Sequence, residues 1–550
     1  MRLNPFQRLA HIPRYREVTN VLVKHGFGFI FNRISPGKLR KREQQELRGV
    51  SAARELREAF EELGPTYVKL GQLLSTRPDL LAPEFIRELE KLQDDVPPIS
   101  YAEVSSVCAN EGIDIEEAFA YFNYEPLAAA SIAQVHEAVL KDGQKVVVKV
   151  QRPGIDRQIR IDLQILMEIA RILEKRTDWG HLYQVTEIVD ELGEAIINEV
   201  DFRKEAHNAD VFYSNFHKEE HVIIPRVYWD YSSKRILTLE YVEGVKISDV
   251  VELKKALYDP KKIATHLVDA LFKQVYEYGF FHADPHPGNL AITEGEGIIF
   301  YDFGQIGVID RITREKAMDL VVGMMKYDVD AVARALLDIG IGTQSINKAE
   351  FHREISRLQQ KYYGLPLAQI NVGEALSELI ELSLYFRVRV PPELSLLVKM
   401  IMTVERIVSQ LDPTLSIVDI AEPYGKKLLR QRFSPEQLME SAESLLRDYA
   451  AVARTLPRDV DNVLKMIEAG EIKIHMEHTN LNRLTNKVDI LSNRLSLAII
   501  LASIIIGTSL VVGQSSSKLF SRIPLVEVGF CAAIILGLLL AYSIFKSGRY

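Results

Sequence analysis

The residues whose types and spacing suggest chemistry lie between positions 280 and 307. In this segment, FFHADPHPGNLAITEGEGIIFYDFGQIG, Asn289 follows Asp284 by five residues, and Asp302 begins the triplet DFG 13 residues after Asn289. Aspartate and asparagine oxygens suit Mg²⁺, which takes one or two carboxylates and completes its shell with phosphate oxygens. A further carboxylate that does not bind metal can accept a hydroxyl proton or orient the attacking group. The pattern therefore predicts magnesium-dependent phosphoryl transfer.

A lysine and a glutamate farther upstream fit the same chemistry. Lys149 ends the apolar run VVVKV, and a lysine at the end of a buried strand needs a negative partner because an unpaired buried ammonium is costly. In a protein kinase that partner is a helix glutamate, and the pair holds the α- and β-phosphates; the candidate here is Glu205. Taken singly, Lys149, Asp284 and Asn289 could be a strand-end charge, a loop cap and a turn residue. Their common order with Glu205 and Asp302 is that of a protein kinase, and it favours a site for ATP and Mg²⁺.

Two further segments would complete a nucleotide site. Where a kinase has its glycine-rich loop, this chain has Ala128, Ala129, Ala130 and Ser131. Alanine does not adopt positive φ as freely as glycine, so this loop is expected to cradle phosphate in a different way. The segment LTLEYVEG (237–244) resembles a kinase hinge, where backbone groups of Glu240 and Val242 would meet the adenine edge.

The elements that must position these residues can be read from the hydrophobic pattern. Residues 51–95 favour helices, with a new helix starting at Gly64-Pro65. Residues 121–150 alternate around a Lys-Asp-Gly turn and predict a strand hairpin. Helical spacing over 184–215, two strand-like runs (221–227 and 235–241), a short strand pair around 290–309 and further helices to residue 480 complete the pattern. This order predicts an α+β fold with two lobes.

The composition excludes several classes of protein. The chain has 550 residues, of which 47% are apolar and 26% charged, so it is neither disordered nor collagen-like. Its two cysteines, Cys108 and Cys531, cannot form a disulfide framework or a four-cysteine zinc site. A reducing compartment is the simplest interpretation.

The charge is unevenly distributed along the chain. The formal net charge is −8, yet residues 1–50 carry a local net of +8, which leaves −16 on the rest. A basic N-terminal segment on an acidic body argues against nucleic-acid binding and fits contact with an anionic surface, although a solvated basic helix would have the same composition.

Two uncharged runs near the carboxyl end predict a membrane hairpin. Leu495–Gly513 reads LSLAIILASIIIGTSLVVG and Val528–Phe545 reads VGFCAAIILGLLLAYSIF, with a short polar link between them. At ~1.5 Å rise per residue the first run covers roughly 28 Å, close to the ~30 Å hydrocarbon core of a bilayer. The alternative is a hydrophobic dimerisation hairpin.

Together with a motif upstream, these residues resemble the UbiB family of atypical kinases, also called aarF-domain kinases. That motif is Lys69-Leu70-Gly71-Gln72, which matches the family's KxGQ signature. The AAAS loop, the phrase VVVKVQRPG, the ExD motif Glu199-Val200-Asp201 and DPHPGN also match, over roughly residues 60–310. The paired carboxyl-terminal runs are similar to those of bacterial members.

The resemblance implies a role for each matching residue. Lys149 and Glu205 would clamp phosphate, Asn289 and Asp302 would hold Mg²⁺, and Asp284 would occupy the catalytic-base position. Lys69 would reach into the active site and pair with the ExD acids, with Gln72 nearby, in a segment that covers the cleft where an ordinary kinase admits a peptide. On an ideal helix Glu199 and Asp201 lie 200° apart and cannot both face Lys69, so either the helix breaks or only one acid pairs with it. His282 and His286 are expected to pack in the loop and not to bind metal.

The expected organisation is a bilobal protein-kinase-like fold with a helical KxGQ extension and a transmembrane helical hairpin. Its parts are a basic segment (1–50), the KxGQ extension (51–120), the two kinase-like lobes (121–243 and 244–345), a helical extension (346–490) and two transmembrane helices (491–550). Family members resemble ATPases more than protein phosphorylators and support ubiquinone or related prenyl-lipid pathways.

Three functions remain open at this point. The first is a membrane-anchored ATPase that supports isoprenoid quinone biosynthesis, with the lipid surface, quinone precursors and quinone-biosynthesis enzymes as partners. The others are a protein or small-molecule kinase and a non-catalytic nucleotide-binding scaffold. The expected location is the inner (cytoplasmic) membrane with a cytosolic catalytic domain, or an organellar inner membrane in a eukaryote.

Overall fold

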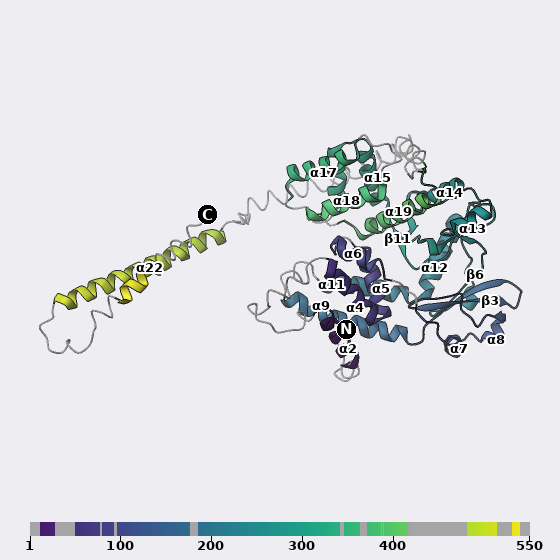
Figure 1. The fold of residues 1–550 in the computed structure, drawn as a ribbon, viewed down its shortest axis with the longest axis horizontal. Helices are drawn as coiled ribbons and strands as arrows, with labels where there is room; N and C mark the ends of the chain where they lie inside the picture. Colours follow the sequence, from purple (N-terminus) through teal and green to yellow (C-terminus); the bar gives the residue numbers. More distant parts are fainter. Residues whose placement is uncertain are drawn as a thin grey trace, which may run out of the picture. The chain divides into compact units, whose positions relative to one another are not determined.

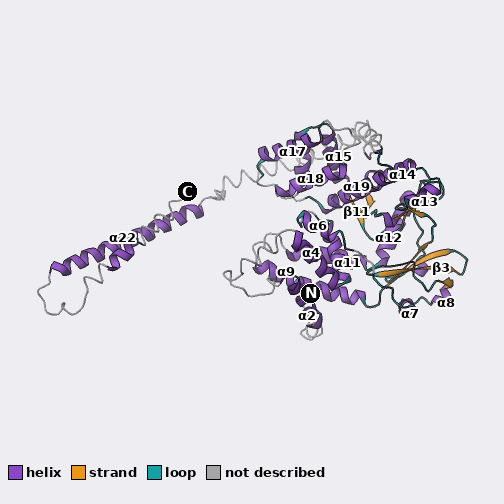
Figure 2. Cartoon of the chain, viewed as in Figure 1, coloured by secondary structure: helices purple, strands orange, loops and turns teal. Residues whose placement is uncertain are grey.

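The computed structural model forms two compact units, residues 1–434 and 435–550 (Figure 1). The residues that it describes are 12–27, 50–77, 80–92, 96–176, 185–340, 346–363, 371–386, 388, 390–415, 417, 420, 481–513 and 531–538. Within the first unit, strands and helices combine as an α+β fold, which confirms the predicted class (Figure 2).

The smaller lobe is built on a five-stranded antiparallel sheet with the order β1-β3-β4-β6 and with β2 beside β3. Its strands are β1 (Phe119–Phe122), β2 (Ala128–Ala129), β3 (Ala133–Leu140), β4 (Lys145–Gln151) and β6 (Ile236–Glu240). The predicted hairpin is confirmed as β3 and β4, whose connection contains Gly143 at φ 89°. Val146, Val148 and Val150 are fully buried on one face of β4, so Lys149 projects from the opposite face.

Helices cover both faces of this sheet. On one face, α7 (Tyr101–Asn110) and α8 (Ile115–Ala118) pack against the buried valines of β4. The other face, which includes Leu237 and Leu239 of β6, packs against a helical layer. That layer consists of α2 (Ile12–Lys24), α4 (Val50–Leu63), α5 (Pro65–Ser75), α6 (Pro83–Leu89), α9 (Ile155–Arg176) and α11 (Val185–Glu199). As predicted, α5 starts directly after Gly64, which has φ 90° and is followed by proline.

The basic N-terminal segment is partly integrated into this layer. Of residues 1–50, the structure describes 12–27 and the first residue of α4. Val18, Val21 and Leu22 of α2 are buried, and Arg14 binds the fully buried Asp162 of α9. Arg14 is therefore engaged in the fold and is not available to an anionic surface.

The larger lobe combines two small sheets with helices. One sheet has the order β5-β10-β9-β7 and the other pairs β11 with β8. These strands are β5 (Val222–Ile223), β7 (Val245–Lys246), β8 (Phe280–His282), β9 (Leu290–Ile292), β10 (Ile298–Phe300) and β11 (Ile306–Val308). The expected strand pair near residue 300 is confirmed as β9 and β10, while the run 221–227 contributes only β5 and a single bridge at Val227.

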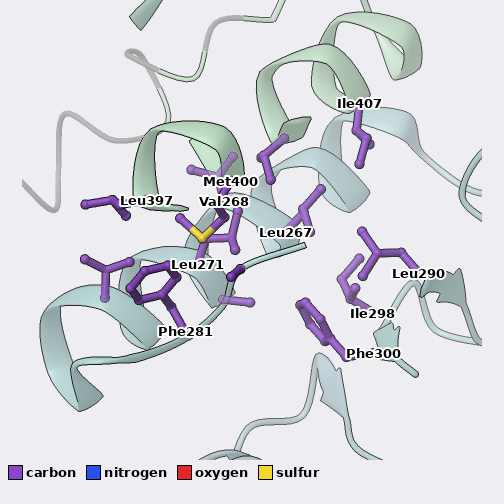
Figure 3. Packing of buried hydrophobic residues seen from close by; sticks show 14 of the residues in the cluster. Leu267, Val268, Leu271, Phe281, Leu290, Ile298, Phe300, Leu397, Met400 and Ile407 are labelled. Carbon is purple, nitrogen blue, oxygen red and sulfur yellow. The ribbon is translucent and has the colours of Figure 1, made fainter. Parts of the chain in front are cut away.

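The helices of this lobe pack around two clusters of buried apolar residues. They are α12 (Phe202–Phe216), α13 (Val250–Lys255), α14 (Pro260–Phe272), the π-helical turn η3 (Lys273–Tyr278), α15 (Arg311–Met325), α16 (Val329–Ile339), α17 (Lys348–Tyr362), α18 (Val372–Tyr385) and α19 (Pro392–Leu411), together with the short 3₁₀ turn η4 (Pro287–Asn289). Another 3₁₀ turn, η2 (Trp229–Tyr231), packs against the sheet of the smaller lobe. In Figure 3, Leu267 and Leu271 of α14 face Leu397 and Met400 of α19, with Phe281 of β8 close by. Thus α19, far along the chain, packs against β8, the strand that precedes Asp284 and Asn289.

The second unit contains α22 (Leu481–Gly513) and a helical stretch at 531–538. The first apolar run lies within α22, whereas most of the second run lies outside the described residues. Among the described residues, no helix has the length and hydropathy needed to cross a membrane, so the predicted transmembrane hairpin is not supported.

Candidate active site

Lys149 and Glu205 form the predicted ion pair. The ammonium of Lys149 donates to both carboxylate oxygens of Glu205, at 2.8 and 2.9 Å. Strand β4 carries the lysine, and Glu205 lies in the first turn of α12, which begins at the cap residue Asp201. Glu205 is only 6% exposed, so the pair is largely shielded from water.

The electrostatics of this pair favour the charged state at neutral pH. Burial lowers the pKa of Lys149, but the carboxylates of Asp302 and Glu205 more than compensate and raise it above its usual value. Burial raises the pKa of Glu205, and the neighbouring ammonium opposes that shift. Because both Glu205 oxygens accept hydrogen bonds from Lys149, we assign the pair as ammonium and carboxylate.

Asp302 and Asn289 belong to two segments that are hydrogen-bonded to each other. The backbone N–H of Tyr301 donates to the carbonyl of Asn289 at 3.0 Å, which brings the two motifs side by side. Asp302 Oδ2 lies 3.7 Å from Lys149 Nζ, and Oδ1 accepts a bond from the N–H of Gly304. Burial raises the pKa of Asp302, but Lys149 and the Gly304 N–H outweigh it and lower the pKa to about 2.

This donor set fits Mg²⁺. Asp302 is ionised, and the Asn289 amide donates its N–H to the carbonyl of Asp284, which leaves its side-chain oxygen as the ligand atom. One carboxylate and one amide oxygen, completed by phosphate and water, match the preference of the ion. A metal bound here would neutralise phosphate charge beside Lys149.

Asp284 belongs to a tightly bonded loop. Its carbonyl accepts bonds from the N–H of His286 and the amide of Asn289, and its own N–H donates to His282 Nδ1. Its carboxylate, which is about one-third exposed, forms an ion pair of 3.1 Å with Lys399 of α19. The Asp284 carboxylate is therefore partly accessible and is held by Lys399.

The alanine-rich loop is a tight connection between the antiparallel strands β2 and β3. Ala128 and Ala129 form β2, and the N–H of Ala130 donates to the carbonyl of Ala133 at 2.8 Å. Arg152 donates to the carbonyl of Ala130, which fixes the loop to the end of β4. Ser131 is buried, and its hydroxyl has no hydrogen-bond partner among the described residues.

The hinge segment is partly engaged by the protein itself. The N–H of Glu240 donates to the carbonyl of Arg226, and the Tyr301 hydroxyl donates to the carbonyl of Val242 at 3.0 Å. An adenine edge would therefore share the Val242 acceptor or displace Tyr301. The bridge between Val227 and Leu239, which draws residue 226 alongside β6, explains the first contact.

Lys69 reaches the ExD motif through one acid. Its ammonium lies 2.7 Å from Glu199 Oε1, as expected. The helix breaks after Glu199, and Asp201 directs its carboxylate to Arg203 while capping α12. Lys69 is also close enough to Lys149 and Asp302 to lower the pKa of each.

The other two motif residues pack and brace α5. A Cβ on Gly71 would lie 2.9 Å from Phe60 Cδ2 and even closer to Leu92, so the helix approaches its neighbours there as only glycine allows. The Gln72 amide donates to the carbonyl of Leu92. Both residues therefore support the helix that presents Lys69.

The two histidines of the loop differ in their surroundings, since His282 is buried and His286 is exposed. His282 is buried beside Phe212, Phe300 and Phe303, and burial lowers its pKa. His286 accepts a bond from the N–H of Gly288 at the start of η4.

Two residues next to the motif were missed by the sequence analysis. Asn208 of α12 donates to the carbonyl of Phe303 at 2.9 Å, which links the helix bearing Glu205 to the DFG segment. Lys399 reaches Asp284 from a helix 115 residues downstream. The three-residue spacing of Glu205 and Asn208 was a usable signal for the first, but no local pattern marks Lys399.

Comparison with known proteins identifies the family. The model of the ABC1 atypical kinase-like domain matches residues 91–336, that of the UbiB helical domain matches 355–416, and that of the ABC1/UbiB kinase-like C-terminal domain matches 479–546.

Three relatives illustrate the breadth of this similarity. A Clostridium pasteurianum protein from the hydrogenase 1 5′ region is 33% identical, covering 97% of this chain and 99% of the relative. The probable protein kinase UbiB of Cellvibrio japonicus is 34% identical (78% and 79% covered). The chloroplastic protein ACTIVITY OF BC1 COMPLEX KINASE 7 of Arabidopsis thaliana is also 34% identical (90% and 72% covered). The chain therefore belongs to the ABC1/UbiB family of atypical kinase-like proteins.

Proposed function

We propose that this chain is a membrane-anchored, kinase-like ATPase that binds Mg-ATP and supports the biosynthesis of ubiquinone or a related isoprenoid quinone. The observation that carries the nucleotide part is the charged group formed by Lys149, Glu205 and Asp302, with distances of 2.8 and 3.7 Å from the lysine. A lysine held by a glutamate and facing a metal-binding aspartate is the arrangement that kinases use for the phosphates of ATP.

Hydrolysis is favoured over transfer to a protein by the position of the KxGQ helix. Helix α5 contributes a lysine whose charge reaches both Lys149 and Asp302. Because α5 lies beside the proposed nucleotide site, it would occupy space that a peptide acceptor needs in order to reach the γ-phosphate. A water molecule is small enough to reach the γ-phosphate without that space.

The membrane and quinone parts rest on the apolar end of the chain and on the family resemblance. Large apolar side chains of α22 are exposed, among them Ile499, Ile506 and Leu510, each at least 58% accessible. Contiguous exposed apolar surface favours a covering partner, and we assign a lipid bilayer to that role. A chain bound to the bilayer in this way would be close to lipid-soluble substrates such as quinone precursors.

The test is phosphate release from Mg-ATP by the full chain, with and without anionic liposomes, beside Asp302→Asn. We expect turnover that rises with liposomes and falls by about a hundredfold or more in the variant, because the variant loses the metal-binding charge. Binding of Mg-ATP without release of phosphate under any condition would refute the ATPase and leave a nucleotide-binding scaffold.

A protein or small-molecule kinase remains the second candidate, because Asp284 has a partly accessible carboxylate and would act as the catalytic base. Incubation with γ-labelled ATP and an extract of the membrane distinguishes the two activities. Label that appears in a protein or lipid, and not only in free phosphate, would favour the kinase.

A further inference from the structure

We propose that Lys399, on helix α19, is a positioning residue for the Asp284 carboxylate of the catalytic loop. The ammonium of Lys399 lies 3.1 Å from Asp284 Oδ1. This inference rests on the proposed ATP turnover and assigns an active-site role to the region matched by the UbiB helical domain.

Packing fixes the place from which Lys399 reaches the loop. Its neighbours Val398 and Met400 are 8% and 2% exposed, so α19 is firmly seated in the core of the larger lobe. Figure 3 shows Met400 and Leu397 over α14, with Phe281 of β8 nearby. Strand β8 leads directly into Asp284, so the helix and the loop share one rigid support.

The contacts of Asp284 divide between backbone and side chain. The loop holds its N–H and carbonyl through His282, His286 and Asn289. In the described part of the chain, Lys399 is the only lysine or arginine within 4.0 Å of the carboxylate. The direction of the side chain therefore depends on this ion pair.

The loop itself contains no residue that could replace this cation. Between Asp284 and Asn289 the chain reads Pro-His-Pro-Gly, and the His286 ring accepts a bond from the loop backbone. Two carboxylates, Asp284 and Asp302, would otherwise face a triphosphate with like charge. A lysine from α19 offsets this repulsion and fixes the direction of the Asp284 carboxylate.

The experiment compares Lys399→Met and Lys399→Arg in the full chain by steady-state phosphate release. Lys399→Met should lower kcat roughly tenfold to a hundredfold, with a much smaller change in KM for ATP, because a misdirected catalytic group affects the chemical step more than ground-state binding. Lys399→Arg should restore most of the loss. In an Asp284→Asn background, Lys399→Met should cause no further loss, since the lysine acts through that carboxylate.

A matched control is Lys361→Met, which removes another lysine–carboxylate pair from the same helical region. Lys361 binds Glu374 and Glu378 of α18 and has no contact with the loop. This control should leave kcat unchanged. Unchanged or increased kcat in Lys399→Met, or additive losses in the double variant, would overturn the inference.

A second readout does not depend on turnover. Amide hydrogen exchange of residues 283–289 should become faster in Lys399→Met and stay at the wild-type rate in Lys399→Arg and Lys361→Met. If the wild-type chain releases no phosphate, the proposed ATPase fails, and this exchange measurement alone decides the role of Lys399. Equal exchange in all four proteins would overturn it.

Discussion

At the residue scale, the ion pair of Lys149 and Glu205 is proposed to bind nucleotide, and it also places a charged carboxylate in the protein interior, where that carboxylate needs a partner. Glu205 is 6% exposed and has Lys149 as its charged hydrogen-bond partner. Removal of one partner from a buried pair leaves the other charge without compensation, which is more harmful than replacement of both. The pair therefore connects nucleotide binding with folding.

Lys149→Met should destabilise the protein by about 3 kcal/mol at pH 8 and by less at pH 5. Burial raises the pKa of Glu205 above that of the unfolded chain, and loss of the ammonium removes the group that lowers it. Between these two pKa values folding takes up a proton, so the stability of the variant rises as the pH falls. Urea unfolding at both pH values measures the difference.

The control for that experiment is Lys149→Met combined with Glu205→Gln. This double variant has no ionisable group at the pair, so its own free energy of unfolding should change less between pH 5 and pH 8 than that of Lys149→Met. If Lys149→Met lowers the free energy of unfolding equally at pH 5 and pH 8, Glu205 is not the titrating group.

Gly71 gives a second prediction at this scale. Alanine normally stabilises a helix by about 1 kcal/mol relative to glycine. Here its methyl group would overlap the buried side chains of Phe60 and Leu92, and such overpacking costs about 1–3 kcal/mol. We expect Gly71→Ala to lower the thermal midpoint, whereas Gly112→Ala tests a glycine with open space but positive φ (80°). A higher midpoint for Gly71→Ala would contradict the packing argument.

At the element scale, the helical layer is joined at one fully buried carboxylate. Asp162 of α9 binds Arg14 of α2 at 2.7 Å and accepts a 2.7 Å hydrogen bond from Thr66 of α5. Arg14 also donates to the carbonyl of Leu63 at the end of α4. Four helices therefore meet at this group, and α5 is the one that presents Lys69.

Arg14→Met should destabilise the chain by about 3 kcal/mol, since it leaves the Asp162 charge buried with only a hydroxyl as partner. We also expect weaker Mg-ATP binding, because the position of α5 is less well defined. Chemical denaturation and nucleotide titration measure the two effects. Arg16→Met, on the same helix and at an exposed position, should change neither. A loss of stability equal to that of Arg16→Met would refute the role of the buried pair.

The contacts of the candidate site that could be predicted from the sequence are those between residues that lie in short local patterns. The kinase-like order of Lys149, Glu205 and Asp302 was recognisable because each lies in a short local pattern, and the structure brings the three together. The geometry of Glu199 and Asp201 was not predictable, since it depends on where one helix ends and Asp201 caps the next. The pair of Lys399 with Asp284 joins residues 115 positions apart, and no local period signals it.

At the scale of the whole molecule, the candidate site and the exposed apolar helix belong to different units of the chain. The first unit, residues 1–434, holds every site residue and several buried apolar clusters. The second unit, residues 435–550, contains α22 with its exposed isoleucines and leucines. A unit with its own core is expected to fold without its neighbour.

Residues 1–434 alone should therefore unfold cooperatively and bind Mg-ATP within roughly threefold of the full chain, a difference of well under 1.4 kcal/mol. The same fragment should no longer sediment with anionic vesicles, because the apolar surface of the second unit is missing. Nucleotide titration and vesicle sedimentation measure these properties, and full-chain Asp302→Asn is the control, since it should lose nucleotide-dependent turnover but still sediment. A fragment that sediments as well as the full chain would place the membrane contact in the first unit. The basic residues of segment 1–50 other than Arg14 would then be the candidates, because this segment carries a net charge of +8.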